Sequence, residues 1–283
     1  MKILTFDVED WFHILDNDLT KTETEWINFD SRVAHNMQKI FTLLENKNLN
    51  ATFFVLGWIA EKYPEIVKEI DNRGFDIGTH SHMHQLIYTQ SKTIFKNDLI
   101  KSISVIENIT GKKVKSFRAP GFSITENSKW AFEILCDQGI EIDCSLFPAN
   151  RAHGGLPSFK KNKPCLINFH GHQIKEFPIN TNLFFGKPII FSGGGYFRLL
   201  PYSYIKHCTM SSDYVMSYFH PRDFDPDQPQ IPGLKFFRRF KSTVGLRGCE
   251  KKLRKWVSDF DFINLSKADQ QINWNEADEV IFS

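Results

Sequence analysis

The sequence lacks the features that would place it across a membrane or mark it for export. No run of about 20 apolar residues, the length that a membrane-spanning helix needs, occurs in the chain. The first residues, MKILTFDVEDWFH, carry acidic side chains inside their apolar stretch. A secretory signal needs an uninterrupted apolar segment and a small-residue cleavage site. We therefore expect no integral membrane segment and a cytoplasmic location.

An excess of charge of one sign is also missing. The chain has 35 Lys and Arg residues against 33 Asp and Glu, a formal net charge of +2. This balance indicates no nucleic-acid partner and no acidic tail. The five cysteines form no CxxC pair, which argues against a disulfide framework and against a zinc–thiolate site. Nothing in the sequence indicates the oligomeric state.

Segments typical of strands and helices alternate through the first half of the chain. Apolar runs typical of buried strands occupy residues 2–8, 51–60, 75–80, 115–123 and 140–148. Apolar residues recur at helical spacing in residues 31–50, 63–74, 93–111 and 127–139. This alternation predicts an α/β fold with a parallel sheet or a (β/α) barrel.

The alternation breaks near residue 150. Residues 150–205 mix glycine, proline and aromatic residues, and we interpret them as a loop-rich insertion that shapes a binding face. The segment VGLRGCEKKLRKWVSDF, at 244–260, predicts a basic amphipathic helix in a C-terminal extension. A solvated helix face explains that helix better than contact with a membrane surface. Because no repeat or linker interrupts the chain, we expect residues 1–283 to form a single domain.

Reactive side chains gather where the expected strands end. They are Asp7, Glu9 and Asp10 after the first strand, His80 and His84 after the third, Arg118 in the fourth, and His220 after the run VMSYF. In parallel α/β folds the carboxyl ends of the strands line the ligand crevice. These side chains are therefore expected to meet in one site.

The two histidines at 80 and 84 have the spacing of a metal site. One helical turn or a tight loop can aim both imidazoles at one divalent ion, and a nearby carboxylate would complete the set. His82, between them, is expected to point elsewhere. Taken alone, a histidine-rich surface turn is the better explanation of the spacing. The acidic triplet that closes the first strand favours the metal site.

The remaining polar residues each have a structural explanation beside the functional one. Acidic residues after a strand commonly cap helices or lie in solvated turns. Asp7, however, lies inside an apolar strand, where an unpaired carboxylate is costly to bury, so it needs a metal or Arg118 nearby. His220 and Asp143, which close later strands, fit structural roles as well as a site. The Pro-Gly turn at Gly121 can present a backbone N–H that stabilises an oxyanion.

Taken in order, these segments resemble the polysaccharide deacetylases of carbohydrate esterase family 4, which share a homology domain with the nodulation chitooligosaccharide deacetylases. The similar motifs are TFDVED, ATFFVLG, HSHMH, FRAPGF, IDCSLFP and YFHP. The resemblance runs from residue 3 to about residue 225, and the ordered set is far more specific than any one piece. DVEDWFH, FRAPGFSI and GGGYFRLLPY resemble, more narrowly, a bacterial branch found with surface-polysaccharide biosynthesis.

The resemblance implies a distorted (β/α) barrel, usually of seven strands, that removes an N-acetyl group from an amino sugar. It also implies a divalent metal cofactor, first zinc and otherwise cobalt, nickel or manganese. By position, the roles that the resemblance implies are Asp7 as general base, His80 and His84 as metal ligands, Arg118 as the residue that tunes Asp7, Gly121 as oxyanion donor, His220 as general acid, and Asp143 as the residue that orients His220.

Two departures from the family pattern affect the site residues. Many relatives have adjacent aspartates in the first motif, whereas Val8 follows Asp7 here, so the metal carboxylate is Glu9 or Asp10. Residues two apart share a face of a strand, which favours Glu9 unless the chain turns there. In PGF, the extra glycine leaves the oxyanion donor less defined and makes Phe122 a candidate pocket wall.

The predicted chemistry is hydrolysis of an amide. A metal polarises the carbonyl, a carboxylate takes the proton of water, and an imidazolium protonates the departing amine. Tyr196 and Arg198, in the aromatic segment GGGYFRLLPY, are candidate contacts of an N-acetylated sugar. Two alternatives remain: hydrolysis of another C–N bond, in a ureide or a cyclic amide, and a carbohydrate-binding protein without turnover. The sequence leaves open whether the sugar is part of a polymer, lipid-linked or nucleotide-linked.

Overall fold

The computed structural model describes residues 1–15, 17–150, 153–184, 186–231, 233–234 and 236–282. The strands of this part of the chain are β1 (Lys2–Ile3), β2 (Thr5–Val8), β3 (Thr52–Val55), β4 (Asp76–Thr79), β5 (Ser116–Phe117), β6 (Ile142–Asp143), β7 (Cys165–Phe169), β8 (His172–Glu176), β9 (Asn182–Phe184), β10 (Lys187–Ile189), β11 (Val215–Met216) and β12 (Glu279–Phe282).

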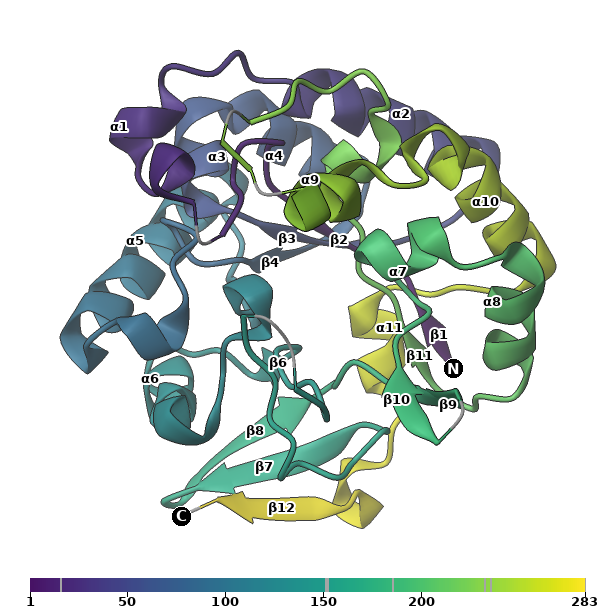
Figure 1. The fold of residues 1–283 in the computed structure, drawn as a ribbon. Helices are drawn as coiled ribbons and strands as arrows, with labels where there is room; N and C mark the ends of the chain where they lie inside the picture. The colour runs from purple at the N-terminus through teal and green to yellow at the C-terminus, as the bar shows by residue number, and fades with distance from the viewer. Residues whose placement is uncertain (16, 151–152, 185, 232, 235, 283) are drawn as a thin grey trace.

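Helices alternate with these strands and pack outside them (Figure 1). The α-helices are α1 (Glu23–Trp26), α2 (Val33–Asn46), α3 (Gly57–Lys62), α4 (Pro64–Asn72), α5 (Lys92–Thr110), α6 (Ala131–Asp137), α7 (Gly194–Leu199), α8 (Tyr202–Met210), α9 (Phe236–Thr243), α10 (Leu246–Asp259) and α11 (Leu265–Gln270). The short 3₁₀ helices are η1 (Asp18–Thr20), η2 (Ile87–Thr89), η3 (Pro120–Phe122), η4 (Glu126–Ser128), η5 (Pro221–Phe224) and η6 (Trp274–Glu276).

The sheet curves into a barrel with one irregular seam. Its strand order is β12-β7-β8-β6-β5-β4-β3-β2, and its neighbours are parallel except β7 and β8. β1 pairs with β11, and an isolated bridge joins Phe6 to Phe219. Beyond β8, the Asn180 side chain accepts the N–H of Met216 in β11. With β1 and β2 counted as one strand, β2, β3, β4, β5, β6, β8 and β11 form the expected distorted barrel.

The strands at the start of the barrel are buried on both faces. All residues of β2 and β3 are buried, and Phe6 stacks on Phe53 with ring centroids 5.2 Å apart. Parallel strands that are covered on both faces read as continuous apolar runs, which is why the sequence predicts them well. Helices α4 and α5 end before Gly74 and Gly111, whose φ angles of 74° and 67° suit glycine.

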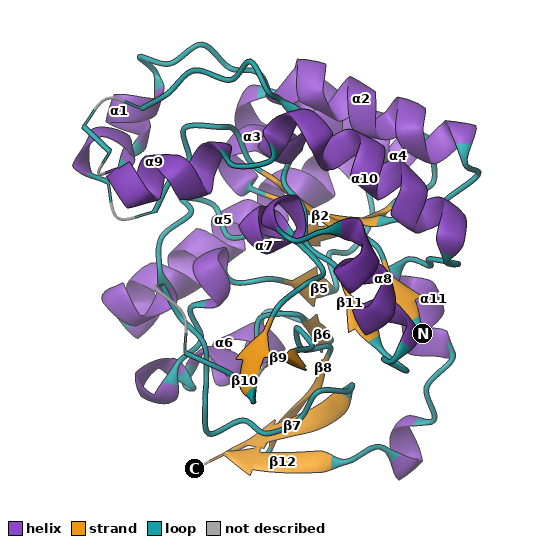
Figure 2. Cartoon of the chain, turned by 45° about the vertical axis from the view of Figure 1, so that its right-hand side comes forward, coloured by secondary structure: helices purple, strands orange, loops and turns teal. Residues whose placement is uncertain are grey.

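Residues 150–205 contain more regular structure than expected. β7 and β8 form an antiparallel hairpin, β9 and β10 form another, and α7 follows them. The alternating burial of β7 fits an edge region of the sheet, but polar flanking residues hide this pattern in the sequence. Figure 2 shows β7, β8 and β12 extending beyond the helix-covered strands.

The C-terminal segment is helical, as expected, and also adds β12 to the edge of the sheet beside β7. α10 falls within the predicted helix 244–260. No helix of the described part of the chain combines the length and the apolar character that a membrane span requires.

A pair of buried carboxyl groups crosses the barrel wall between β6 and β8. Asp143 lies opposite Glu176 in the register of the two strands, their side chains are hydrogen-bonded, and both residues are fully buried. Burial, and then the neighbouring Asp143 carboxylate, raise the pKa of Glu176 well above its ordinary value. Since Glu176 also accepts the N–H of Leu146, a protonated Glu176 satisfies both neighbours.

Glu176→Gln is expected to change how stability depends on pH. The folded chain holds a proton on Glu176 that the unfolded chain releases above a pH of about 4.3, so this group makes folding less favourable as pH rises. The amide cannot ionise and keeps both hydrogen bonds. Between pH 5 and pH 8, the free energy of unfolding of the variant should therefore exceed that of the wild type by about 1 kcal/mol or more, as measured by urea denaturation. Glu65→Gln, on an exposed position of α4, is the control, and an equal response of both variants would contradict the assignment.

Candidate active site

The carboxyl ends of the barrel strands open into one pocket. Its volume is about 520 Å³, within the range of small-ligand sites. Asp7, Glu9, His80, His84, Gly121 and His220 are among the residues that line it. These side chains follow or end β2, β4, β5 and β11, so the barrel brings the predicted clusters together as expected.

The loop that carries the two histidines is held by helix α5. The carboxylate of Asp98 accepts the backbone N–H groups of His82 and Met83, at 2.7 and 2.9 Å. Ser81 and His84 adopt positive φ angles of 66° and 51°, which turn the chain back toward the pocket. His82 points away from the pocket, as expected, with its Nε2 3.4 Å from Glu61.

Glu9, His80 and His84 form a cluster that could hold a metal ion. The three residues are buried, and their candidate ligand atoms lie within 4.8 Å of one another. His80 Nδ1 lies 2.7 Å from the carbonyl oxygen of Arg118. Because a carbonyl only accepts, Nδ1 carries the proton and Nε2 presents its lone pair.

The contact between Glu9 and His84 also supports a metal site. Glu9 Oε2 lies 2.6 Å from His84 Nε2, yet within the described chain this buried oxygen has no partner with the alignment of a hydrogen bond. Burial by itself raises the pKa of Glu9, but the imidazoles of His84 and His220 lower it by more, and the pKa falls well below its usual range. One carboxylate with two imidazoles is a donor set that divalent zinc takes in hydrolases, so the residues fit such an ion.

Asp7 and Arg118 form a buried ion pair beneath the pocket. Arg118 Nη1 donates to Asp7 Oδ1 at 2.7 Å and to the hydroxyl of Thr5 at 2.7 Å. The guanidinium is fully buried and lies 4.3 Å from the ring centroid of Phe54. The cation that Asp7 was expected to need is therefore Arg118, and the contact fixes one carboxylate oxygen while Oδ2 faces His220.

His220 lies across the pocket from these carboxylates. Its Nε2 is 3.9 Å from Asp7 Oδ2 and 3.8 Å from Glu9 Oε1. Its Nδ1 is 3.1 Å from Asp223 Oδ2, and Asp223 also accepts the backbone N–H of His220. Burial alone would lower the pKa of His220, but the carboxylates of Glu9, Asp223 and Asp7 outweigh it and raise the pKa to about 9.

Asp223 is held in turn by an arginine. Arg198 Nε lies 3.0 Å from Asp223 Oδ1. Burial raises the pKa of Asp223, but Arg198 and then His220 lower it by more, to about 2. Asp223 is therefore an anion that keeps a proton on His220 Nδ1.

Two of the expected residues lie elsewhere. Asp10 is not near the other candidate ligands: its carboxylate accepts the N–H groups of Arg32 and Val33 at the start of α2, as a helix cap does. Glu9 is therefore the carboxylate beside the histidines, although β2 ends at Val8 and the Glu9 N–H donates to the carbonyl oxygen of Asp7, so the chain turns there. Asp143 contacts Ser145 and Glu176, so the expectation that it orients His220 is corrected: Asp223 occupies that place.

The candidate substrate contacts separate into two groups. Gly121, with a φ of 61°, and Phe122 line the pocket, as does Arg198. The guanidinium of Arg198 is already engaged, because it donates to the carbonyls of residues 241, 242 and 244 besides its contact with Asp223. Tyr196 is 43% exposed and does not line the pocket, which corrects its assignment.

His13 is a pocket residue that sequence reasoning missed. It is buried, and its Nδ1 accepts the N–H of Asp10 at 3.0 Å, which leaves the proton on Nε2. Burial, and then the charge of His84, lower the pKa of His13 well below its usual value. No local sequence pattern identifies His13 as a pocket residue, because its position depends on the turn after β2.

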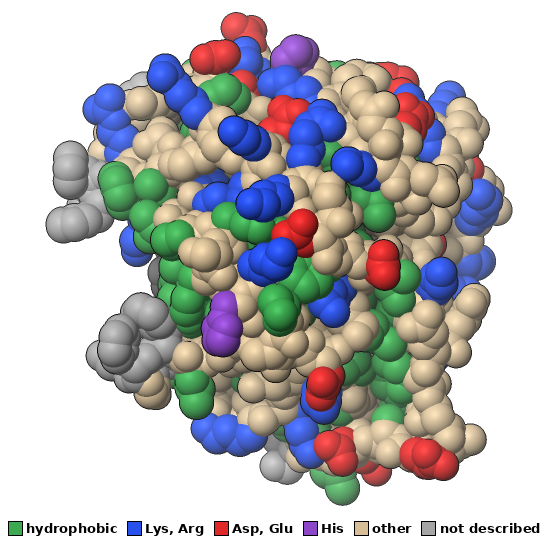
Figure 3. Space-filling model, turned by 90° about the vertical axis from the view of Figure 1, so that its right-hand side faces the viewer, with side chains coloured by type: hydrophobic (Ala, Val, Ile, Leu, Met, Phe, Trp, Pro, Cys, Tyr) green, Lys and Arg blue, Asp and Glu red, His purple; other side chains and the backbone are tan. Residues whose placement is uncertain are grey.

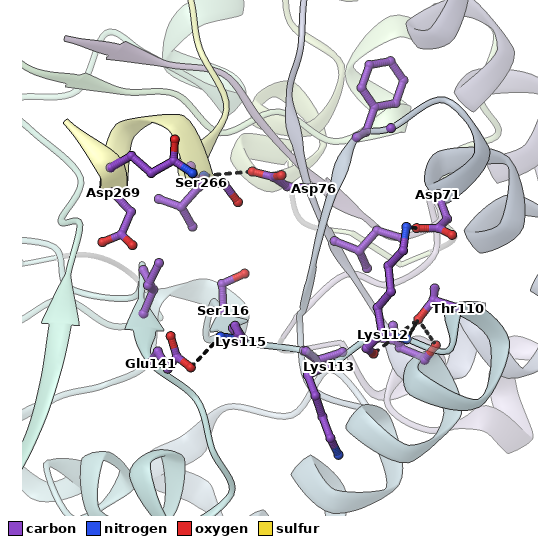
Figure 4. Close-up of a pocket in the computed structure, with 18 residues that line it drawn as sticks. Asp71, Asp76, Thr110, Lys112, Lys113, Lys115, Ser116, Glu141, Ser266 and Asp269 are labelled. Carbon is purple, nitrogen blue, oxygen red and sulfur yellow. Dashed lines mark hydrogen bonds and ion pairs between the residues drawn. The ribbon is translucent and has the colours of Figure 1, made fainter.

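A second cavity lies at the opposite end of the barrel strands (Figure 4). It has a volume of about 460 Å³ and is lined by residues that precede or start β4, β5 and β6. Lys112 is paired there with Asp71, and Lys115 with Glu141. Since its charges are already balanced and it holds none of the predicted clusters, we assign the site to the pocket at the carboxyl ends.

Asp98→Ala is expected to weaken metal binding without touching a candidate ligand. Loss of the carboxylate frees the loop that carries His80 and His84, and the loss of such a supporting contact lowers metal affinity by about 10- to 100-fold. Titration of the metal-stripped protein with Co²⁺, followed by visible absorbance, measures the effect. Asn108→Ala, on an exposed position of the same helix, is the control and should bind as the wild type does. Equal affinities of all three proteins would show that Asp98 does not position the loop.

Two family models match the chain, in adjacent segments. Residues 18–135 match the polysaccharide deacetylase model, and residues 144–270 match a domain of unknown function, DUF3473. The first segment contains the histidine loop and Arg118, and the second contains His220 and Asp223. Both segments contribute strands to the same sheet.

Curated relatives match a limited part of the chain. It is 40% identical to a peptidoglycan-N-acetylglucosamine deacetylase of Bacillus cereus over 96 residues, which are 34% of this chain and 35% of that protein. It is 26% identical to a peptidoglycan-N-acetylmuramic acid deacetylase of Bacillus subtilis over 102 residues, 36% of this chain and 39% of that protein. The matched part thus spans little more than a third of these relatives.

Solved structures extend the likeness over the whole fold. A proposed polysaccharide deacetylase from Mycobacterium smegmatis superimposes with a TM-score of 0.68 at 15% identity, over 100% of this chain and 93% of that one. A family 4 carbohydrate esterase pseudoenzyme from Bacillus anthracis gives a TM-score of 0.50 at 14% identity, over 94% and 64%. With the motif residues gathered at the strand ends, these comparisons show that residues 18–135 are similar to the polysaccharide deacetylase family and that the chain has the fold of solved polysaccharide deacetylase-like proteins.

Proposed function

We propose that this protein is a metal-dependent hydrolase that removes the N-acetyl group from an amino sugar, in a polysaccharide or in its biosynthetic precursor. The observation that carries the proposal is the arrangement of three groups in one pocket: Asp7 and His220 are 3.9 Å apart, and the Glu9–His80–His84 cluster lies beside them. A base, an acid and a set of metal ligands are what amide hydrolysis needs.

Glu9, His80 and His84 are the residues proposed to hold the ion, with zinc as the first choice and cobalt, nickel or manganese as alternatives. When bound, such an ion polarises a carbonyl group and makes water more acidic. His80 is suited to this place because Arg118 fixes its tautomer, and burial lowers its pKa to about 4, so the ring stays neutral near pH 7.

Asp7 is the proposed general base. Its Oδ1 is held by Arg118, so Oδ2 is the atom that can take a proton from water. The buried ion pair keeps this carboxylate in one orientation. Less orientational entropy is therefore lost when the reacting groups align. Removing Arg118 would leave Asp7 buried without its cation.

His220 is the proposed general acid. An amine anion is a poor leaving group, so the nitrogen must receive a proton as the C–N bond breaks. The proton on Nε2 faces Asp7 and Glu9, and Asp223 holds the proton on Nδ1. The backbone N–H of Gly121 is the proposed donor to the oxyanion, and Phe122 the proposed wall of the sugar pocket.

Two other functions fit the fold less well. The first is a carbohydrate-binding protein without turnover. The pseudoenzyme from Bacillus anthracis is an example of a protein of this fold that lacks turnover. Here, however, the residues proposed as base, acid and metal ligands all line one pocket, which supports turnover. Hydrolysis of a ureide or a cyclic amide would use the same groups, and a sugar is favoured by the names of the relatives and by the breadth of the pocket.

The proposal is tested by acetate release from N-acetylglucosamine oligomers and monosaccharide derivatives. The metal-loaded protein should release acetate, and a chelator or His80→Ala should lower the rate by more than about 100-fold because a ligand is lost. His35→Ala, an exposed histidine on α2, is the matched control and should keep the rate. If the metal-loaded protein hydrolyses cyclic amides but no acetylated sugar, the proposal is wrong.

Asp223→Asn tests the assignment of the residue that positions His220. Without the carboxylate, the imidazole loses its fixed orientation and part of its positive charge, and kcat should fall by about 10-fold or more with little change in KM. Metal content, measured on the same preparations, should stay the same. Asp227→Asn is exposed and serves as the control. A drop in metal content, or an unchanged kcat, would rule out the positioning role.

A further inference from the structure

Arg198 connects two parts of the site that come from different elements. It lies on α7, and its guanidinium lies between the carboxylate of Asp223, which contacts His220, and the last turn of α9. Lys241 and Ser242 of that turn are among the residues that line the pocket. One side chain thus links a wall of the pocket to the proposed general acid.

The guanidinium of Arg198 caps the C-terminal end of α9. Its Nη1 donates to the carbonyl oxygens of Ser242 and Val244, at 3.0 and 3.1 Å, and its Nη2 donates to that of Lys241 at 3.0 Å. The last carbonyls of a helix have no partner within the helix and carry its negative partial charge. A cation with several donors is therefore well suited to hold this turn.

The same guanidinium is the counter-charge of Asp223. Arg198 Nε lies 3.0 Å from Asp223 Oδ1, in an ion pair without the alignment of a hydrogen bond. Both side chains are buried, so solvent screens their attraction only weakly. Burial by itself raises the pKa of Asp223, and the charge of Arg198 is the first of the influences that lower it. Without Arg198, the carboxylate behind His220 would be buried without its cation.

Arg198 differs in this respect from the surface cations of the molecule. Figure 3 shows Lys and Arg side chains over the upper part of one face, with Asp and Glu side chains among them. Cations on such a surface are solvated, and replacing one of them costs little. Arg198 is only 7% exposed, so its charge has to be balanced inside the protein. Its contacts with Asp223 and with the carbonyls at the end of α9 provide that balance.

The backbone of Arg198 is held as firmly as its side chain. Lys252, from α10, donates to three carbonyl oxygens at the end of α7, among them that of Arg198 at 3.0 Å. Gly245, in the turn between α9 and α10, has a φ of 70°, and a Cβ at this position would collide with the Arg198 carbonyl oxygen. This close packing argues against a movement of Arg198 toward a substrate.

We propose that Arg198 is a positioning residue of the reaction: through Asp223 it fixes the imidazole of His220, and through the carbonyls that it binds it couples this imidazole to the last turn of α9. This inference rests on the proposed function and concerns the control of the same site. Arg198 lines the pocket but acts on the departing amine only through His220, without touching the sugar. The planar fork of a guanidinium can serve both ends at once, which a lysine ammonium cannot do.

The test separates proton transfer to the leaving group from the rest of the reaction. As the C–N bond of the acetamido group breaks, the nitrogen keeps the electron pair of that bond, takes the Nε2 proton of His220 and leaves as an amine. An aryl acetate needs no such proton, because the phenolate that leaves is a stable anion. Hydrolysis of N-acetylglucosamine oligomers and of 4-nitrophenyl acetate is therefore compared for the zinc-loaded protein, and only the chelator-sensitive rate is counted.

Removal of the guanidinium should affect the amide far more than the ester. Arg198→Met should lower kcat on the oligomers by about 10-fold or more with little change in KM, and the rate on the ester by less than about 3-fold. Arg239→Met removes the same kind of side chain from an exposed position of α9 and is the control. Equal losses on both substrates would mean a general disturbance of the pocket and would overturn the inference.

A change outside the pocket tests the link to α9. Gly245→Ala places a methyl group against the backbone of Arg198 and should displace the turn that follows α9, with the same selective loss on the amide. Gly248→Ala, at a position of α10 where an added Cβ meets open space, is the control. Full activity of Gly245→Ala on the oligomers would overturn the link between α9 and His220.

A double variant decides the question if a single variant does not fold. Arg198→Met combined with Asp223→Asn removes both buried charges together, which costs less than leaving one of them unpaired. If Arg198 acts only through Asp223, the double variant should have the same kcat on the oligomers as Asp223→Asn alone. A further loss of about 10-fold in the double variant would mean that Arg198 acts independently of Asp223, and it would overturn the inference.

Failure of the proposed function would be seen separately. Deacetylation by the wild type, with equal losses on amide and ester in Arg198→Met, would keep the proposed function and overturn only the inference. If the wild type releases no acetate from any acetylated sugar, the NMR signal of the His220 Nδ1 proton in the zinc-loaded protein decides the inference. A signal that Arg198→Met abolishes and Arg239→Met retains supports the positioning role, and an equal signal in both variants overturns it.

Discussion

The 2.6 Å contact between Glu9 Oε2 and His84 Nε2 is the constraint on which the rest of the site depends. A carboxylate oxygen and an imidazole nitrogen this close in a buried pocket share a proton or a cation between them. The loop from His80 to His84, the end of β2 and the barrel that aligns them all serve to keep these atoms together. The cluster brings several charged groups together, and many of the polar residues around it pair with those groups.

That network alternates positive and negative groups from the barrel interior to the rim. Arg118 lies beneath Asp7, His220 faces Asp7 and Glu9, and Asp223 lies behind His220 with Arg198 behind it. Each charge has an opposite neighbour, so burying the set costs far less than burying its members singly.

The strands and the reactive clusters at their ends could be predicted from the sequence because both are local patterns. Apolar runs identify β2 and β3. The spacing of two residues from Asp7 favoured Glu9 over Asp10, although β2 itself ends at Val8. Asp98 could not be predicted, because it reaches the histidine loop from the middle of a helix. Asp223 had a usable signal: it stands three residues after His220, the spacing of a capping box, and its carboxylate accepts the His220 N–H. Asp143 was misassigned because β6 ends at the edge of the sheet where the site lies, whereas the side chain of Asp143 pairs with a residue of β8 and does not reach His220.

The pairing of β1 with β11 has a consequence for how the protein is made. Thr5 and Ser217 are hydrogen-bonded across 212 positions of sequence. The first strand can therefore pair with β11 only after the last quarter of the chain has been reached. Contacts this distant in sequence form late, because the loop between them must be closed first. During synthesis the proposed metal ligands would leave the ribosome long before His220 and Asp223 do. A chain stopped short of residue 220 would thus carry Glu9, His80 and His84 but not the proposed acid.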